Sequence, residues 1–419
     1  MQRYFSNLPF PKGLCYDRAH RLKELSNGVK VVTEDWNSPV QCVGLMIDAG
    51  SRMDFQMPGV AYLTSKLLER NLKKKLGFVD FSFKKDYTWV AVKGPDGLEE
   101  LTKCLVDFRV EEGFTEVKDQ VLSELDEYQL LDHVHKAAFK GHALGNFTKG
   151  EKSSIKSTKK EDVYKFLRTH YTGNRVTVSA AGGIEASQVL KKSKTLEELP
   201  KGKPLLLKSP NYTSSNFVKS SSSEYTHLGI AFPAPACTQS EYVSFRILEN
   251  LMNNPFYIPY VNHSEQFNTL HALFTQTGGL VQHGCEYISY KEAGLLFHHL
   301  VTEPLASVFL ASSVLKAMLS TTSAVLTEEL YRAKNQVFTQ LAAPESSPEI
   351  AFENANQIRK FGDKVSRSTF ASNIYLEDPE VLASDYDKWI SNALPVIGVY
   401  GKVVAENLPE LIYKQASLT

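Results

Sequence analysis

One stretch, residues 43–71, carries the local pattern from which the fold of this chain can be read. It runs VGLMIDAGSRMDFQMPGVAYLTSKLLERN. The apolar run Val43–Ile47 is short and is followed by the polar loop Asp48–Pro58, which is typical of a buried strand. Gly59–Asn71 then places apolar residues at helical spacing and is predicted to be a helix. The stretch therefore predicts a strand–loop–helix unit.

The same unit occurs again in the second half of the chain. Leu228–Phe232 is predicted to be a strand, and a short loop leads from it to the predicted helix Ser240–Met252. In both halves a further strand, further helices and a closing buried strand follow in the same order. Each half also contains a long polar-faced helix, from Glu116 to about Lys140 and from Thr327 to about Leu341. This repetition of elements predicts two related α+β domains.

A segment rich in Pro, Gly and Ser separates the two halves. It extends from Leu196 to Tyr225 and is predicted to be a linker. The predicted domains are therefore residues 1–195 and 226–419.

The composition excludes several classes of protein. The 419 residues include 47 Lys and Arg against 47 Asp and Glu, and this balance argues against a nucleic-acid-binding or polybasic membrane-surface protein. No apolar run approaches the roughly 18–20 residues that span a bilayer. The five cysteines are widely spaced, with no C-x-x-C, which argues against a disulfide scaffold or zinc ribbon and indicates a reducing compartment.

The usual sequence signs of an active site are missing. The chain has no G-x-G-x-x-G after a strand, no P-loop and no G-x-S-x-G. No two of its 11 histidines are four residues apart, which is the spacing that places two zinc ligands on one helical face. The carboxylates of Glu124, Asp126 and Glu127 are predicted to be a solvated helix face. The sequence therefore predicts no cofactor.

Several short motifs nevertheless occur along the chain in an order that is typical of one protein family. They are Leu25–Val32, Asp48–Arg52, Gly59–Ala61, Ile155–Ser157 and His170–Arg175 in the first half, and Ser289–Leu296 and Arg332–Gln336 in the second. Together they resemble the pitrilysin-like family of zinc metallopeptidases, and most closely the branch of mitochondrial processing peptidase subunits and respiratory complex III core proteins. The resemblance extends nearly end to end. It implies two homologous α+β domains, each a mostly antiparallel sheet packed on helices.

The family's metal motif is changed at every functional position. Active members carry an inverted motif, H-x-x-E-H, whose two histidines bind zinc and whose glutamate activates water. The matching residues here are Tyr62, Ser65 and Lys66. Glu124 could match the family's third ligand, but alone it would hold no metal. The resemblance therefore implies a chain without zinc that is not an enzyme by itself.

Two further departures bear on the branch of the family. After Asn71 the chain passes through three lysines to Phe78 and Phe83, where the family usually has some twenty more residues. The segment Asn253–Ser264 has no glycine and contains two prolines, which argues against the glycine-rich substrate loop of the processing peptidase alpha subunit. The chain is therefore more similar to the core protein 2 branch.

The resemblance implies a non-catalytic core subunit of complex III, ubiquinol–cytochrome c reductase, lying peripherally on the matrix side of the mitochondrial inner membrane. The implied partners are a related core subunit of core 1 or beta type, cytochrome b and cytochrome c1. Phe256, Tyr257 and Tyr260 are candidate interface anchors, although ordinary packing would explain them equally well. Two alternatives stay open: an alpha-type subunit that binds presequences for a catalytic beta partner, and a peptidase with a relocated site.

Overall fold

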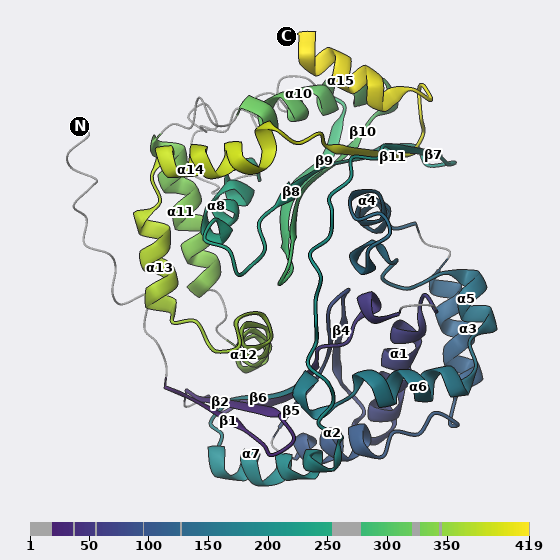
Figure 1. The fold of residues 1–419 in the computed structure, drawn as a ribbon, viewed down its shortest axis with the longest axis vertical. Coiled ribbons are helices and arrows are strands. Elements are labelled where there is room, and N and C mark those ends of the chain that lie inside the picture. Colours follow the sequence, from purple (N-terminus) through teal and green to yellow (C-terminus); the bar gives the residue numbers. More distant parts are fainter. Residues whose placement is uncertain are drawn as a thin grey trace.

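The computed structural model describes residues 19–36, 38–54, 57–94, 96–125, 128–253, 278–320, 327–342 and 346–418. Its described part is built on two β-sheets, each with helices packed on both faces (Figure 1). The first sheet is formed by the first half of the chain and the second sheet by the second half.

The first sheet has six strands, and all but one of its neighbouring pairs are antiparallel. The strands are β1 (His20–Glu24), β2 (Lys30–Asp35), β3 (Cys42–Ile47), β4 (Asp80–Phe83), β5 (Thr88–Lys93) and β6 (Val176–Gly182). Their order is β1-β2-β6-β3-β5-β4, and only β2 and β6 run parallel. The predicted strand Val43–Ile47 is β3, which lies at the centre of this sheet and is buried along its whole length.

The second sheet repeats this arrangement without a counterpart of β1. Its strands are β7 (Phe217–Ser220), β8 (Thr226–Ala234), β9 (Leu280–Ser289), β10 (Gly294–Thr302) and β11 (Val396–Gly401). Their order is β7-β11-β8-β10-β9, and again a single pair, β7 with β11, is parallel. The predicted class, two homologous α+β units with mostly antiparallel sheets, is confirmed.

The helices of the first half correct one prediction. They are α1 (Val60–Leu76), α2 (Gly97–Val106), α3 (Phe114–Glu124), α4 (Leu130–Ala138), α5 (Lys152–Ser157), α6 (Lys160–His170) and α7 (Ala186–Ser193). The single long helix expected from Glu116 to Lys140 is wrong, because the chain leaves the helix after α3 and Gln129 is extended. The break lets α3 pack beside α1 while α4 packs on the other sheet.

The helices of the second half surround the second sheet, with one exception. They are α8 (Tyr242–Met252), α10 (Ser307–Ser320), α11 (Thr327–Ala342), α12 (Ser347–Phe361), α13 (Arg367–Leu376), α14 (Pro379–Tyr386) and α15 (Leu408–Leu418). None of the helices in the described ranges is long and apolar enough to cross a membrane.

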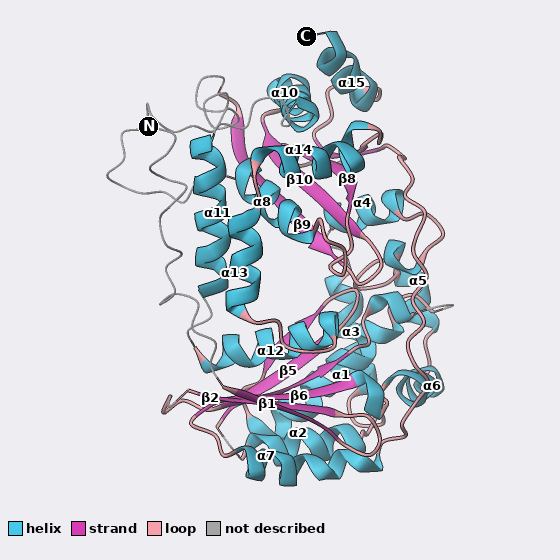
Figure 2. Cartoon of the chain, turned by 60° about the vertical axis from the view of Figure 1, so that its left-hand side comes forward, coloured by secondary structure: helices cyan, strands magenta, loops and turns pink. Residues whose placement is uncertain are grey.

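The exception is α12, which lies over the first sheet, so the two halves exchange helices (Figure 2). A capping box between Ser346 and Glu349 starts this helix. Its residue Phe352 packs edge-on against Trp89 of β5, with ring centroids 5.5 Å apart. In return, α4 packs against β8 and β11 of the second sheet, where Val134 joins a buried apolar cluster. Each sheet is therefore covered on one face by a helix from the other half.

The segment that the sequence predicts as a linker also takes part in the second sheet. Strand β7 lies within residues 196–225, and the hydroxyl of Tyr212 donates to the carbonyl of Ala231 in β8 at 2.9 Å. The domain limits 1–195 and 226–419 remain a proposal.

Candidate functional site

Helix α1 carries the three positions of the altered metal motif, and its start is firmly fixed. The carboxylate of Asp54 accepts hydrogen bonds from the backbone N–H groups of Gly59 and Ala61, both at 2.7 Å. Burial raises the pKa of Asp54 to about 7, although these two hydrogen bonds oppose the rise. Gly59 has a φ of 102°, and a Cβ at this position would collide with the side chain of Ile155. The turn into α1 therefore requires glycine.

Tyr62 lies in the first turns of α1 and points towards α3. Its hydroxyl donates a hydrogen bond to the carboxylate of Glu124. Its ring packs against Phe83 of β4, with centroids 5.2 Å apart. Burial, together with the hydrogen bond to Glu124, raises the pKa of the phenol well above its usual value. Tyr62 therefore stays protonated and acts here as a donor, not as an anionic ligand.

Lys66 lies one turn further along α1, on the same side as Tyr62. Its Nζ is 3.1 Å from Oε2 of Glu69 and 3.8 Å from Oε1 of Glu124. The ammonium group also lies 5.2 Å from the centre of the Phe81 ring in β4, within the range of a cation–π contact. The ammonium group of Lys66 thus places a positive charge at the position where the family has a zinc ligand.

Glu124 is the acceptor that links these groups. Besides the hydroxyl of Tyr62, its carboxylate accepts a hydrogen bond from Nε2 of Gln120 at 3.0 Å. Partial burial acts to raise its pKa, but these hydrogen bonds and the charges of Lys66 and Lys149 outweigh burial and lower the pKa. Glu124 is therefore ionised at neutral pH. We call Tyr62, Lys66 and Glu124 the α1–α3 cluster.

Ser65 does not join this cluster. It is fully buried, and its hydroxyl donates to the backbone carbonyl of Tyr62 at 2.7 Å. The residue that matches the family's catalytic glutamate is thus a short side chain turned back onto its own helix. It offers no general base to a water molecule.

The residues of the α1–α3 cluster do not fit a zinc ion. Zinc in proteins is held by thiolates, neutral imidazoles and carboxylates, whereas the cluster offers a protonated phenol, an ammonium group and one carboxylate that is already bonded. Within the described ranges, no group of three His, Cys, Asp or Glu side chains is arranged to hold a metal ion. The absence of bound metal itself remains a prediction.

A groove of about 380 Å³ runs along α1 beside the cluster. Its lining combines four cationic side chains with one carboxylate and one amide: Lys66, Arg70, Lys73, Lys74, Glu69 and Gln120. The cations are paired, since Lys73 contacts Glu69 at 2.6 Å and Lys74 contacts Glu112 at 3.5 Å. The groove therefore has the character of a surface network of ion pairs.

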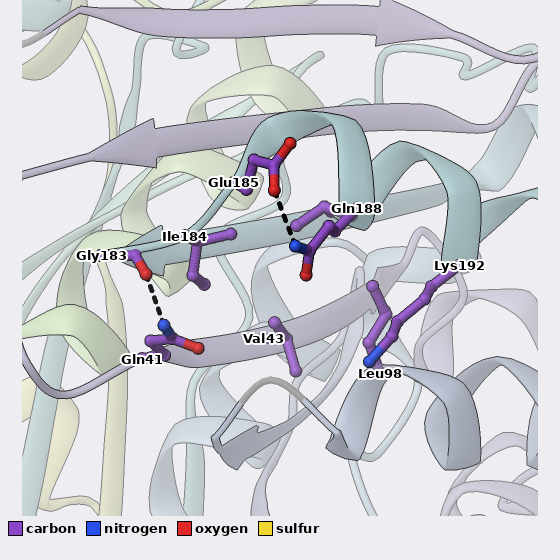
Figure 3. Close-up of a pocket in the computed structure, with 9 residues that line it drawn as sticks. Gln41, Val43, Leu98, Gly183, Ile184, Glu185, Gln188 and Lys192 are labelled. Atoms are coloured by element: carbon purple, nitrogen blue, oxygen red, sulfur yellow. Dashed lines mark hydrogen bonds between the residues drawn. The ribbon is translucent and has the colours of Figure 1, made fainter.

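A second pocket, of about 190 Å³, lies between α7 and the start of β3 (Figure 3). Nε2 of Gln41 donates to the carbonyl of Gly183, and Nε2 of Gln188 donates to Glu185 at 2.6 Å. No residue that lines this pocket is a histidine, cysteine, serine or threonine. Its lining thus lacks the hydroxyl, thiol and imidazole groups of the common catalytic nucleophiles.

The structure also places residues that the sequence alone did not single out. Asp54 fixes the start of α1, and Glu69 is the nearer partner of Lys66. Their sequence signals are an aspartate shortly before a helix start and an acidic residue three positions after a lysine on a helix. Helix α1 also continues through the three lysines to Leu76, beyond its predicted end at Asn71, and β4 follows at Asp80.

Some predicted residues cannot be placed. Phe256, Tyr257 and Tyr260 lie outside the described residues, as do Asp126 and Glu127. The interface role suggested for the three aromatic residues stays a prediction.

The comparisons with known proteins agree with the sequence motifs. Residues 157–337 match the family model described as Peptidase M16 inactive domain. The chain is 24% identical to the ubiquinol-cytochrome-c reductase complex core protein I of Euglena gracilis, over 83% of this chain and 80% of that protein. It is 23% identical to the mitochondrial-processing peptidase subunit beta of Bos taurus (93% and 85% covered). It is 21% identical to the human cytochrome b-c1 complex subunit 1 (97% and 90% covered).

Two solved structures share the fold. A chain of Candida albicans complex III2, bound to Inz-5, superposes with a TM-score of 0.85 and 17% identity, with 94% of this chain and 99% of that chain covered. A peptidase M16 inactive domain from Pseudomonas fluorescens superposes with a TM-score of 0.78 and 17% identity, with 92% and 99% covered.

These findings define the class of protein. The chain has the two-sheet fold of the inactive M16 peptidase domains, and the predicted resemblance to this peptidase family is confirmed. Among its relatives are core proteins of the cytochrome b-c1 complex and beta subunits of the mitochondrial processing peptidase. The three relatives named above are of core protein I or beta type, so the narrower assignment to the core protein 2 branch stays a prediction.

Proposed function

We propose that this chain is a non-catalytic core subunit of mitochondrial respiratory complex III, the ubiquinol–cytochrome c reductase. The observation that carries the proposal is the chemistry of the α1–α3 cluster. Where a peptidase of this family would use two histidines and a glutamate, the chain has a protonated phenol, a buried serine and an ammonium group that contacts Glu124. The cluster lacks the two histidines and the glutamate with which this family binds zinc and activates water, and the match of residues 157–337 to a model described as an inactive domain supports a non-catalytic role.

The relatives support the assignment to complex III. Core protein I of the Euglena complex and subunit 1 of the human cytochrome b-c1 complex both align along most of this chain. In this role the protein works through packing and recognition. We propose that it lies peripherally on the matrix side of the inner membrane, paired with a related core subunit and in contact with cytochrome b and cytochrome c1.

Co-migration on a non-denaturing gel tests the proposal. Solubilised mitochondrial membranes from the source organism would be separated, and the chain located with an antibody. We expect it in the same band as cytochromes b and c1, which their haem absorbance identifies. Migration as a small matrix heterodimer with peptidase activity would contradict the proposal.

The alternative is an alpha-type subunit of the processing peptidase, and the similarity to processing peptidase subunits keeps it in consideration. Mixing the purified chain with a catalytically active beta subunit separates the two roles. A core subunit should leave presequence cleavage at the level of the beta subunit alone, whereas an alpha-type subunit should raise it.

Zinc content provides an independent check on the non-catalytic assignment. We expect no stoichiometric zinc in the protein purified without chelator. Zinc bound at about one ion per chain would favour a peptidase with a relocated site.

A further inference from the structure

Two of the short sequence motifs, far apart along the chain, meet in the structure. The first is the loop after β3, Asp48–Arg52, and the second is the turn of the β9–β10 hairpin, residues 289–294. Some 240 residues separate the contacting side chains. Both views show the strands of the second sheet extending towards the first half of the molecule (Figures 1 and 2).

The strongest contact between them is a buried ion pair. The guanidinium group of Arg52 binds the carboxylate of Glu292 through both terminal nitrogens, with Nη1 at 3.4 Å from Oε2 and Nη2 closer to Oε1. The two side chains are only 4% and 6% exposed. Little water reaches either charge, so the pair compensates much of the charge of both side chains, while Asp86 and Asp48 also act on the guanidinium of Arg52.

A second ion pair, of opposite polarity, lies beside the first. Nζ of Lys291 is 3.3 Å from Oδ2 of Asp48, and this pair is partly exposed, at 31% and 17%. The loop thus presents an acid and then a base, and the hairpin presents a base and then an acid. A shift of the hairpin by one residue would bring Glu292 towards Asp48, and the repulsion between like charges would oppose it. The two pairs therefore specify one register.

The neighbouring hairpin residues are tied on both sides. Nδ1 of His135 lies 2.9 Å from the carbonyl of Leu131 and so carries the proton, which leaves Nε2 to accept the hydroxyl of Tyr290 at 2.9 Å. This bond anchors the hairpin to α4, which packs on the second sheet. Nζ of Lys360, on α12 over the first sheet, donates to Ser289 at 3.2 Å. Four consecutive hairpin residues thus make polar contacts outside the hairpin.

The loop and the hairpin each pack tightly against the backbone of their own sheet, so neither can move independently of that sheet. A Cβ on Gly50 would lie 2.2 Å from the carbonyl oxygen of Lys84, and one on Gly294 would lie 2.2 Å from the carbonyl oxygen of Pro235. The loop is therefore packed onto the connection between β4 and β5, and the hairpin onto the end of β8. Each carries its charges at a fixed position relative to its own sheet.

We propose that Asp48, Arg52, Lys291 and Glu292 form an inter-sheet clasp, which holds the two sheets at one fixed separation and keeps the molecule closed. The clasp joins the loop after β3 directly to the β9–β10 hairpin, and it acts between two halves that also exchange helices α4 and α12. It goes beyond the proposed function, since it concerns the chain by itself.

Hydrogen–deuterium exchange of the purified 419-residue chain tests the clasp. In the Glu292→Gln variant Arg52 loses the charged carboxylate that it binds on the hairpin and keeps only negative charges of its own half, such as Asp48 and Asp86, so the clasp should open. We expect amides in residues 48–53 and 287–294 to exchange at least tenfold faster, with α7, on the far side of the first sheet, unchanged. The matched control is Glu99→Gln, which removes a carboxylate from the exposed pair with Lys103 and should leave exchange as in the parent.

The partly exposed pair gives a second test. Lys291→Asp should accelerate exchange in the same two segments, whereas Lys291→Arg, which keeps a cation beside Asp48, should leave exchange slow. The clasp is refuted if Glu292→Gln leaves exchange within twofold of the parent, or if exchange rises equally in α7. It is also refuted if Glu292→Gln fails to fold and Lys291→Asp leaves exchange as in the parent. The measurement needs no partner protein, so its failure would leave the proposed function standing.

Discussion

Replacing Lys66 by methionine removes the ammonium group from the α1–α3 cluster while it keeps most of the aliphatic side chain. Helix propensity changes little, because lysine and methionine are both good helix formers. The change therefore tests whether the internal cation stabilises the carboxylates around it.

The expected loss of stability follows from the contacts. The side chains of Lys66, Glu69 and Glu124 are 16%, 12% and 26% exposed, so their pairs lie between buried pairs, where losing one partner costs about 3–5 kcal/mol, and exposed pairs worth about 0–1 kcal/mol. The carboxylates are not left alone, since Glu69 keeps Lys73 and Glu124 keeps Tyr62. We therefore expect a loss of about 1–2 kcal/mol.

Equilibrium urea unfolding of four proteins measures this loss: the parent, Lys66→Met, Glu124→Gln and the double variant. The interaction between Lys66 and Glu124 is the non-additive part of the cycle, about 0.5–1.5 kcal/mol for a partly buried contact. The pKa of Glu124 is lowered in the folded state, so the stability it contributes is present above the carboxyl's unfolded pKa and is lost as the pH falls. The interaction should therefore disappear in acid.

Two results would refute this reasoning. One is a Lys66→Met protein as stable as the parent, which would mean that the ammonium contributes nothing to the site. The other is strict additivity with Glu124→Gln at neutral pH, which would assign the stability to other partners of the two side chains. Lys103→Met, in an exposed pair with Glu99, is the matched control and should leave stability as in the parent.

Three further outcomes are expected. Phe352→Ala should lower the free energy of unfolding by about 2–4 kcal/mol, because the ring packs on the first sheet from the exchanged helix α12. Thermal unfolding followed by circular dichroism measures the loss, and an unchanged melting temperature would contradict the expectation. The triple variant Tyr62→His, Ser65→Glu, Lys66→His should bind zinc with Glu124 as third ligand, and a failure to bind zinc by calorimetry would mean that α1 and α3 are not placed for a metal. Burial lowers the pKa of His298 to about 3, so the unfolded chain takes up this proton first, and His298 should contribute a fall in stability of about 1.4 kcal/mol per pH unit between about pH 6.5 and pH 3. The buried His135 and His170 add to the fall in the same direction. His298→Phe should therefore reduce the slope by its own share, and an unchanged slope would contradict the assignment.

Much of the fold could be predicted because its signal is local. The strand Val43–Ile47 is apolar at every position, since both faces of β3 are covered, and the sequence reports that directly. The repeat is visible for the same reason, as each half needs the same strands and helices in the same order. The break between α3 and α4 could not be predicted, because it depends on α4 leaving its own half to cover the other sheet.

For the candidate site, too, part of the chemistry could be predicted from the sequence and part depends on the tertiary structure. The resemblance matches Tyr62, Ser65 and Lys66 to the family's zinc motif, and these side-chain types do not supply the zinc ligands and the general base of that motif. The sequence could link Glu124 to the zinc motif only through the resemblance, since almost fifty positions separate it from the end of α1 at Leu76. That the ammonium of Lys66 lies between Glu69 and Glu124 follows from the packing of α1 against α3.

By itself, then, the sequence determined the two related α+β halves, because they are encoded in residue type and spacing along short segments. The loss of the zinc-binding side chains is a prediction from the resemblance to the peptidase family. Only the tertiary structure decided how the halves are joined. The exchange of α4 and α12 and the pairing of Arg52 with Glu292 depend on contacts between residues far apart in the chain. Such contacts produce no repeat in the sequence. They depend on how two sheets are placed in space, whereas a repeat of apolar residues reflects the geometry of a single helix or strand.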